Sequence, residues 1–253
     1  MELLDWSILA PAMVTGMLVL STHVPLGQEV LKRGIIFIDL AIAQIAGLGV
    51  LLAGVMGFED NMLAVQISAV SAALLASSVL HWTEKRWPQS QEALIGSLFV
   101  LAATGSILLL AGNPHGAEHL KDLLVGQILW VTWDMLVPIA LLYAVLLIAW
   151  FRWHGRFGRK GFYIVFAFAV TASVQLVGVY LVFSSLILPA LATRRLSGRS
   201  RIWTGYLLGA CAFLTGVVLS ALFDLPTGAV VVWTMAMLGL IFGLYLGHRS
   251  KHV

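Results

Sequence analysis

The chain has 253 residues, of which 60% are hydrophobic and only 11% are charged, and its mean hydropathy is +0.96. These values exclude a soluble globular domain and indicate a membrane protein with many spans. The net charge of +3 comes from Lys and Arg at the ends of apolar segments, which indicates membrane topology and argues against nucleic-acid binding. The single cysteine, Cys211, excludes a disulfide framework.

The first apolar segment follows Glu2 and Asp5 and lacks a basic flank, so we expect it to be a membrane helix and not a cleaved signal. About 20 apolar residues cross the hydrocarbon core as a helix. The candidate spans are residues 7–31, 35–56, 62–82, 92–112, 130–151, 161–178, 179–195, 203–223 and 228–247. We therefore predict an all-α membrane protein: a polytopic bundle of about eight to nine transmembrane helices in a single domain, residues 1–253.

Basic and acidic loops alternate along the chain, and this alternation predicts the topology. The loops rich in Lys or Arg are 32–33, 84–86, 152–160, 194–201 and 249–251, and the acidic or histidine-bearing loops are 58–61, 113–122 and 223–226. Basic loops favour the cytoplasm, so the N-terminus is predicted outside and the C-terminus inside.

This topology requires residues 161–195 to cross the membrane and return, although the segment is short for two full crossings. One helix is therefore predicted to be short or broken. We expect Gly178 near the outer turn and a break at Pro189, because the residue before a proline, Leu188, is disfavoured in helical geometry.

Three polar residues interrupt the first two spans. An aspartate at mid-helix costs about 2.5–3.5 kcal/mol, so Asp39 is a candidate pathway residue unless it lies near the interface and pairs with Lys32 or Arg33. Gln44 is a packing or pathway residue, and His23 is either a hydrogen-bonded core histidine or a ligand. If the first two helices pack together, His23, Asp39 and Gln44 would line one polar track with Glu29.

The predicted outer loop 113–122 carries His115, Glu118 and His119 at spacings of three and four residues. Imidazole and carboxylate groups at this spacing can hold a metal ion. The alternative is a solvated interfacial loop.

Short motifs follow one another in a fixed order along nearly the whole chain. They are Pro25-Leu26-Gly27, Glu84-Lys85-Arg86, Glu92 with Gly96, the Leu-x-Gly-x-x-Leu stretch 124–129, the apolar-to-basic stretch 177–195 and the Ser-to-Gly stretch 220–228. In this order they resemble the integral-membrane permeases of bacterial ABC importers for zinc, manganese and iron.

This resemblance implies a permease homodimer in the bacterial inner membrane, with the pathway between its subunits. It implies a separate cytoplasmic ATPase that binds ATP, which agrees with the lack of a GxxxxGK[ST] loop in the chain, and a periplasmic or lipoprotein metal-binding protein. The chain itself would be no enzyme and would bind no cofactor. The ATPase-coupling segment would be 190–202, with Ala190, Arg194, Arg195, Leu196, Ser197, Gly198 and Arg199; the alternative is a basic loop that only sets topology.

The second helix departs from the family pattern Gly-Asp-x-x-x-His. Aligned on Gly49, Gln44 takes the place of the histidine and Leu40 that of the aspartate, with Asp39 one residue early. The expected cargo is zinc, with manganese or iron next. Two alternatives remain: a metal-chelate ABC permease, and an ion-gradient transporter, which the few embedded charges and the lack of an internal repeat disfavour.

Overall fold

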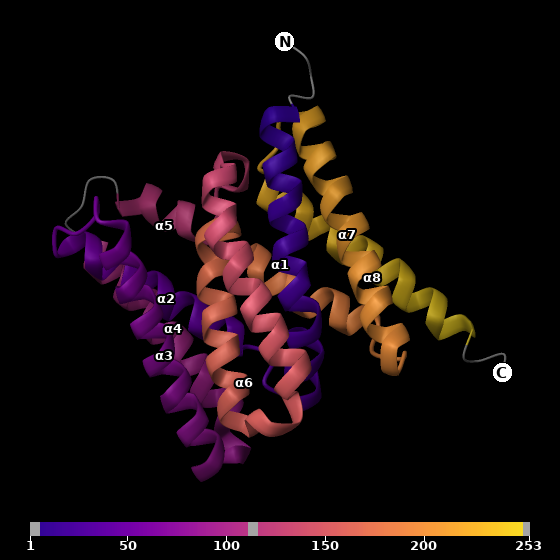
Figure 1. Cartoon of the computed structure of the whole chain (residues 1–253), viewed down its shortest axis with the longest axis horizontal. Coiled ribbons are helices and arrows are strands. Elements are labelled where there is room, and N and C mark those ends of the chain that lie inside the picture. Colours follow the sequence, from indigo (N-terminus) through magenta and orange to yellow (C-terminus); the bar gives the residue numbers. More distant parts are fainter. Residues whose placement is uncertain (1–5, 111–115, 250–253) are drawn as a thin grey trace. The chain divides into compact units, whose positions relative to one another are not determined.

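The computed structural model describes residues 6–110 and 116–249, without the side chains of 116–119, 153–159 and 247–249. These residues form helices and no strand. The helices are α1 Trp6–Arg33, α2 Ile38–Val55, α3 Met62–Arg86, α4 Gln91–Leu110, α5 Gly116–Val125, α6 Trp133–Ala192, α7 Gly198–Phe223 and α8 Thr227–Arg249, with 3₁₀ turns η1 Pro88–Ser90 and η2 Ile128–Trp130 (Figure 1). The predicted all-α fold is confirmed.

Eight helical segments in the described part of the chain are long and apolar enough to span a membrane. They are Trp6–Arg33, Ile38–Val55, Met62–Arg86, Pro88–Leu110, Trp133–Arg152, Lys160–Ala192, Gly198–Phe223 and Thr227–Leu246. They agree with the predicted segments, except that 161–178 and 179–195 form one helical stretch. The number confirms the predicted eight to nine spans, and the orientation of the termini stays a prediction.

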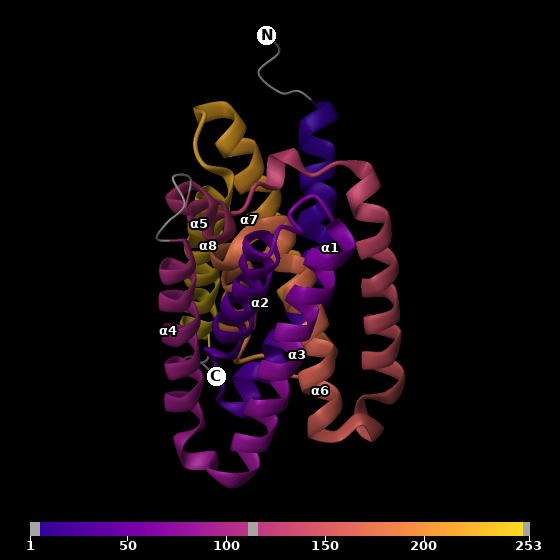
Figure 2. The same ribbon diagram turned by 90° about the vertical axis from the view of Figure 1, so that its left-hand side faces the viewer.

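Helix α6 changes direction although its backbone is helical throughout (Figure 2). The rings of Trp150 and Phe162 lie 6.3 Å apart, whereas twelve residues of straight helix would separate them by about 18 Å. Gly178, whose φ is 77°, interrupts the regular helical geometry but does not end α6. The outer turn predicted near this residue stays a prediction.

The predicted break at Pro189 is wrong, because α6 continues through this proline to Ala192. Pro189 stands in the last helical turn, where its fixed φ is compatible with helix and only one hydrogen bond is lost. The N–H of Thr193 donates to the Pro189 carbonyl at 3.1 Å, and the Thr193 hydroxyl donates to the same oxygen at 2.7 Å. These two bonds close the helix end.

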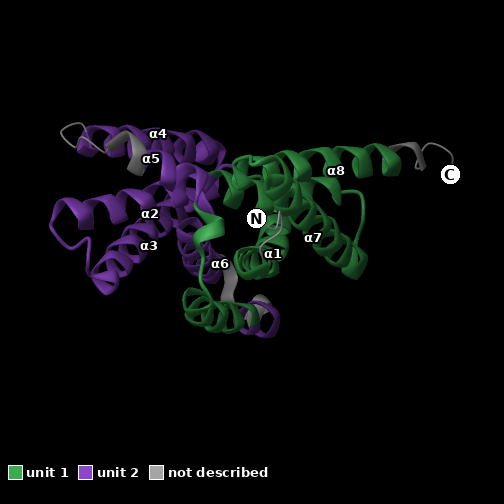
Figure 3. Cartoon of the chain, turned by 90° about the horizontal axis from the view of Figure 1, so that it is seen from above, with its two compact units in different colours: residues 1–34, 127–147, 180–253 green, residues 35–126, 148–179 purple. Residues whose placement is uncertain are grey.

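The described chain divides into two compact units (Figure 3). Unit 1 comprises residues 1–34, 127–147 and 180–253, and unit 2 comprises residues 35–126 and 148–179. In unit 1, α7 packs against both α1 and α8, and in unit 2, α2 packs against both α3 and α4. The single-domain organisation stays a prediction.

In unit 1, Gly27 allows α1 to lie directly against the end of α6. A Cβ at this position would overlap the Leu186 carbonyl group and lie 3.4 Å from the Cβ of Ala190. The glycine of the Pro-Leu-Gly motif is thus required for close helix packing.

In unit 2, the backbone at Gly126 packs directly against the backbone at Gly178. Both have a positive φ, 75° and 77°, and a Cβ on either one would overlap the main chain around the other. The glycine after α5 therefore docks at Gly178 in α6, which explains why these two motifs carry glycine.

Gln66 of α3 and Gln175 of α6 form a reciprocal pair of side-chain hydrogen bonds, 2.8 and 3.0 Å long, on the exposed surface of unit 2. Replacing either with leucine leaves the other amide unpaired within a membrane span, whereas the double replacement removes both polar groups. We expect a coupling energy of about 1 kcal/mol in a double-mutant cycle of thermal unfolding in detergent. Strictly additive effects would show that the pair contributes nothing.

Candidate functional site

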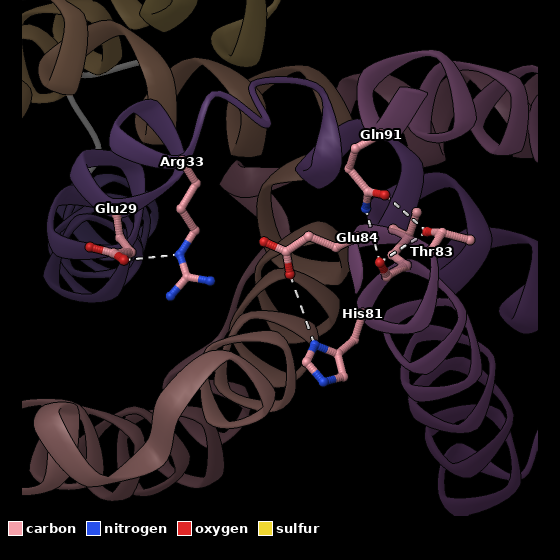
Figure 4. Close-up of polar contacts among 7 residues, drawn as sticks. Glu29, Arg33, His81, Thr83, Glu84 and Gln91 are labelled. Atoms are coloured by element: carbon pink, nitrogen blue, oxygen red, sulfur yellow. Dashed lines mark hydrogen bonds and ion pairs between the residues drawn. The ribbon is translucent and has the colours of Figure 1, made fainter. Parts of the chain in front are cut away.

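Asp39 lies in the first turn of α2 and is fully buried. Within the described residues, neither of its carboxylate oxygens has a side-chain hydrogen-bond partner, and the backbone N–H groups of Asp39 and Leu40 lie beside the carboxylate. An ionised carboxylate in such a place is costly unless a cation or a proton compensates it. Arg33, the ion-pair partner considered from the sequence, instead donates from Nε to Glu29 Oε1 at 2.9 Å (Figure 4). Asp39 therefore does not form the ion pair with Arg33 considered from the sequence, and its role as a pathway residue stays a prediction.

A second carboxylate, Glu92, accompanies Asp39 in unit 2. Glu92 lies in the first turn of α4, and its Oε1 accepts the backbone N–H of Ile36 at 2.5 Å. Its Oε2 is buried, with no hydrogen-bond partner among the described residues. Glu92 is near enough to Asp39 for the two groups to repel each other when both are ionised. A cation near the two groups would reduce this repulsion.

Contacts between α3 and α4 position Glu92. The Thr83 hydroxyl donates to Gln91 Oε1 at 3.0 Å, and Gln91 Nε2 donates to the Leu80 carbonyl at 2.9 Å (Figure 4). On α3, His81 Nδ1 lies 3.9 Å from Glu84 Oε2, and the centre of the His81 ring lies 5.4 Å from that of the Tyr163 ring, with the two rings tilted against each other. The residues around the Glu84-Lys85-Arg86 motif thus fix the turn that places Glu92. Sequence analysis recorded Glu92 only as a motif residue.

Gln44 is also buried on α2, and its Oε1 has no partner among the described residues. It stands five residues after Asp39, which on a regular helix is a rotation of about 140°. Gln44 and Asp39 therefore do not share one face of α2. Leu40, which does share a face with Gln44, is apolar.

His23 is fully buried in unit 1. Its Nδ1 lies 2.8 Å from the Val19 carbonyl oxygen and 3.1 Å from the Thr22 hydroxyl. A carbonyl only accepts, so Nδ1 carries the hydrogen, and the neutral ring keeps a lone pair on Nε2. Nε2 has no partner in the described part of the chain. His23 and Glu29 belong to unit 1, and Asp39 and Gln44 to unit 2, so the polar track stays a prediction.

The predicted histidine loop is partly helical. His115 lies outside the described residues, and Glu118 and His119 lie in α5, a ten-residue helix that sequence analysis took for loop, with side chains that are not described. The metal contact of this segment therefore stays a prediction. Among the described residues there is no group of three or more His, Cys, Asp or Glu side chains that could hold a metal ion.

The predicted coupling segment is a short connection between two helices. Ala190 is buried in the last turn of α6, and residues 193–197 join α6 to α7. Arg194, Arg195 and Arg199 are exposed, and Gly198 has a φ of 58°. Leu196 and Ser197 lie between Arg195 and Gly198. A connection this short can move as a rigid element and transmit a displacement from a partner protein to the helices α6 and α7. Its role in coupling to the ATPase stays a prediction.

Long apolar helices that enclose an ionisable residue, Asp39, define a polytopic membrane protein with a buried charge of the kind that transport proteins carry. Residues 5–157 and 155–245 match the model of the ABC 3 transport family. The chain belongs to this family, which confirms the resemblance recognised in its motifs. It is a membrane transport subunit and not an enzyme.

Known relatives extend over the whole chain. The manganese transport system membrane protein MntC of Halalkalibacterium halodurans is 24% identical over 284 residues, which covers 100% of this chain and 96% of that protein. A probable iron transport system membrane protein of Haemophilus influenzae is 24% identical over 258 residues, covering 93% of each. A chain in the structure of PsaBC from Streptococcus pneumoniae in complex with Fab has a TM-score of 0.77 at 20% identity, covering 93% of this chain and 90% of that one. The structural likeness shows a shared fold.

Proposed function

We propose that the chain is the permease subunit of an ATP-driven importer for a divalent transition-metal ion. The observation that carries this proposal is a pair of carboxylates in unit 2, the fully buried Asp39 and the partly buried Glu92, in a chain of the ABC 3 transport family. A passing divalent cation would neutralise both groups and would supply the partner that Asp39 lacks.

The partners follow from the same assignment. An outer binding protein delivers the metal to a permease homodimer in the bacterial inner membrane, and a cytoplasmic ATPase subunit closes on ATP. Closure of the ATPase moves the segment 190–202, and this movement tilts the permease subunit as a rigid body. The tilt exposes the metal pathway to one side of the membrane and closes it to the other. The chain itself holds no resident cofactor, and the metal is its cargo.

We infer manganese or ferrous iron as the cargo ahead of zinc, which the sequence placed first. The two acids at the start of α2 and of α4, Asp39 and Glu92, offer oxygen donors. Carboxylate and carbonyl oxygens suit manganese, whereas imidazole suits zinc. The two relatives described above support this order, since their names are those of a manganese and a probable iron transport system membrane protein. Zinc remains the alternative because His23 Nε2 is an available imidazole nitrogen in unit 1.

Uptake of labelled manganese, iron and zinc, each under depletion of that metal, tests this proposal in cells with and without the chain. We expect manganese or iron uptake to fall to background without the chain, and zinc uptake to fall less. A hydrolysis-deficient variant of the partner ATPase is the control, and it should have the same effect as loss of the chain.

Each contrary result has a distinct meaning. Unchanged uptake of all three ions would contradict the metal assignment and point to a chelate. Uptake that survives the ATPase variant but stops when the ion gradient is collapsed would identify a secondary transporter instead.

A further inference from the structure

An open groove of about 490 Å³ lies in unit 1, between the end of α6 and the C-terminal half of α8. Its volume is in the range of small-molecule sites. Apolar side chains form its walls and two arginines lie in its lining. The residues that matter here are Leu188, Leu191, Arg194, Arg195, Leu240 and Leu244.

The apolar part of the groove follows α8 from Ala236 to Leu244, a length of about 12 Å. Two glycines of α8, Gly239 and Gly243, form the floor of the groove and place no side chain in it. A Cβ on Gly243 would meet no atom within 4 Å. The groove therefore has room for a narrow hydrocarbon chain.

The two arginines provide the polar part of the groove. Arg194 and Arg195 follow directly after α6, and both are exposed. In the part of the chain that the structure describes, no ion pair involves either guanidinium group. Two adjacent cations without counterions attract an anion, and arginine matches phosphate oxygens with its fork of N–H donors.

The groove lies where two membrane spans end. One candidate span ends at Ala192, which lies against Gly239, and the other ends at Leu246, so the arginines directly follow the end of a span, whereas the leucines lie inside the two spans. Arg194 and Arg195 also belong to the basic loop predicted to be cytoplasmic. Basic pockets between helices at this membrane level suit anionic lipid head groups.

We propose that this groove binds an anionic phospholipid, with its phosphate on Arg194 and Arg195 and one acyl chain along Leu188, Leu240 and Leu244. A phospholipid matches both halves of the groove at once: an anion for the arginines and a hydrocarbon chain for the apolar wall. A polar ATPase surface would match only the arginines, and an apolar helix of a second copy would match only the wall.

The residues of the predicted coupling segment therefore have two different roles. Arg194 and Arg195 hold the lipid, whereas Leu196 to Arg199, which do not line the groove, remain for the ATPase. A lipid bridging α6 and α8 holds the start of the coupling segment against α8.

The test uses the full chain, purified in neutral detergent. Phosphatidylglycerol, phosphatidylcholine with the same acyl chains, and inorganic phosphate are added separately, and the thermal midpoint and the lipid copies retained in native mass spectrometry are measured. We expect phosphatidylglycerol to raise the midpoint by about 5 °C more than phosphatidylcholine, and phosphate to have no such effect.

Two variants and one control connect this effect to the groove. Arg194→Gln/Arg195→Gln removes the charges, and Gly243→Leu fills the floor while keeping them; each should abolish the difference between the two lipids. Arg86→Gln/Arg199→Gln removes two exposed arginines that do not line the groove, and should leave the difference intact.

Four results would overturn the proposal. One is an equal response to the two lipids, and another is an equal loss in the control. An equal response to inorganic phosphate would reveal a free-anion site. If Gly243→Leu turns a dimer into a monomer without any lipid effect, a second copy covers the groove instead.

Discussion

Replacing Gly178 with alanine should prevent the chain from accumulating as a folded membrane protein. Two costs act together at this position. Its φ of 77° costs an L-residue about 1–2 kcal/mol, and the new Cβ would overlap the backbone of Val125 and Gly126. Main chain cannot move aside as a flexible side chain can, so we expect a total above about 4 kcal/mol, a large part of a typical stability of about 5–15 kcal/mol.

Two control glycines separate the costs. Gly54→Ala changes a helical glycine in open space and should be neutral or stabilising by about 0.5–1 kcal/mol. Gly57→Ala changes a glycine with a φ of 82° in open space, so it carries the conformational cost alone. Membrane abundance and the fraction that survives heating in detergent should rank Gly54→Ala, Gly57→Ala and Gly178→Ala in that order. Equal behaviour of the last two would show that the contact with Gly126 is unimportant.

Apolar runs predicted the spans well because the bilayer imposes one length and one structure on every crossing segment. Predictions from local sequence were wrong where contacts with distant residues determine the local structure. Pro189 reads as a break, yet the Thr193 bonds to its carbonyl keep it inside the helix end. Residues 116–125 read as a loop because they are polar, but they form α5, whose Leu123 packs on Gly47.

The candidate site could be predicted only in part. Asp39 was recognised because a charge inside an apolar run is unusual by itself. Glu92 begins its span after a polar turn, so nothing in its local sequence distinguishes it from an ordinary interfacial acid. It becomes a candidate only because Thr83 and Gln91 fix the α3 to α4 turn and Ile36 binds its carboxylate. Contacts between residues 56 positions apart have no signature in a single sequence.

Asp39→Asn should abolish transport while leaving the protein at least as stable as before. Asparagine has the same shape but no charge, so it can neither attract a divalent cation nor repel Glu92. We expect metal uptake below saturation to fall at least about tenfold. The thermal midpoint in detergent should stay the same or rise, because a buried neutral amide costs less than a buried carboxylate without a partner.

These opposite directions distinguish a pathway residue from a structural one. Replacing a residue that only stabilises the fold would lower both the stability of the protein and its transport activity. Removing a charge that is unfavourable for stability but needed for function would lower transport and raise stability. Glu92→Gln should reduce uptake in the same way, although its bond from the Ile36 N–H keeps a partner for Oε1. Asp60→Asn, an exposed acid after α2, is the matched control and should change neither quantity. Full uptake in Asp39→Asn, or its loss from the membrane, would remove Asp39 from the pathway and leave Asp39 and Glu92 without the cation that we assign to them.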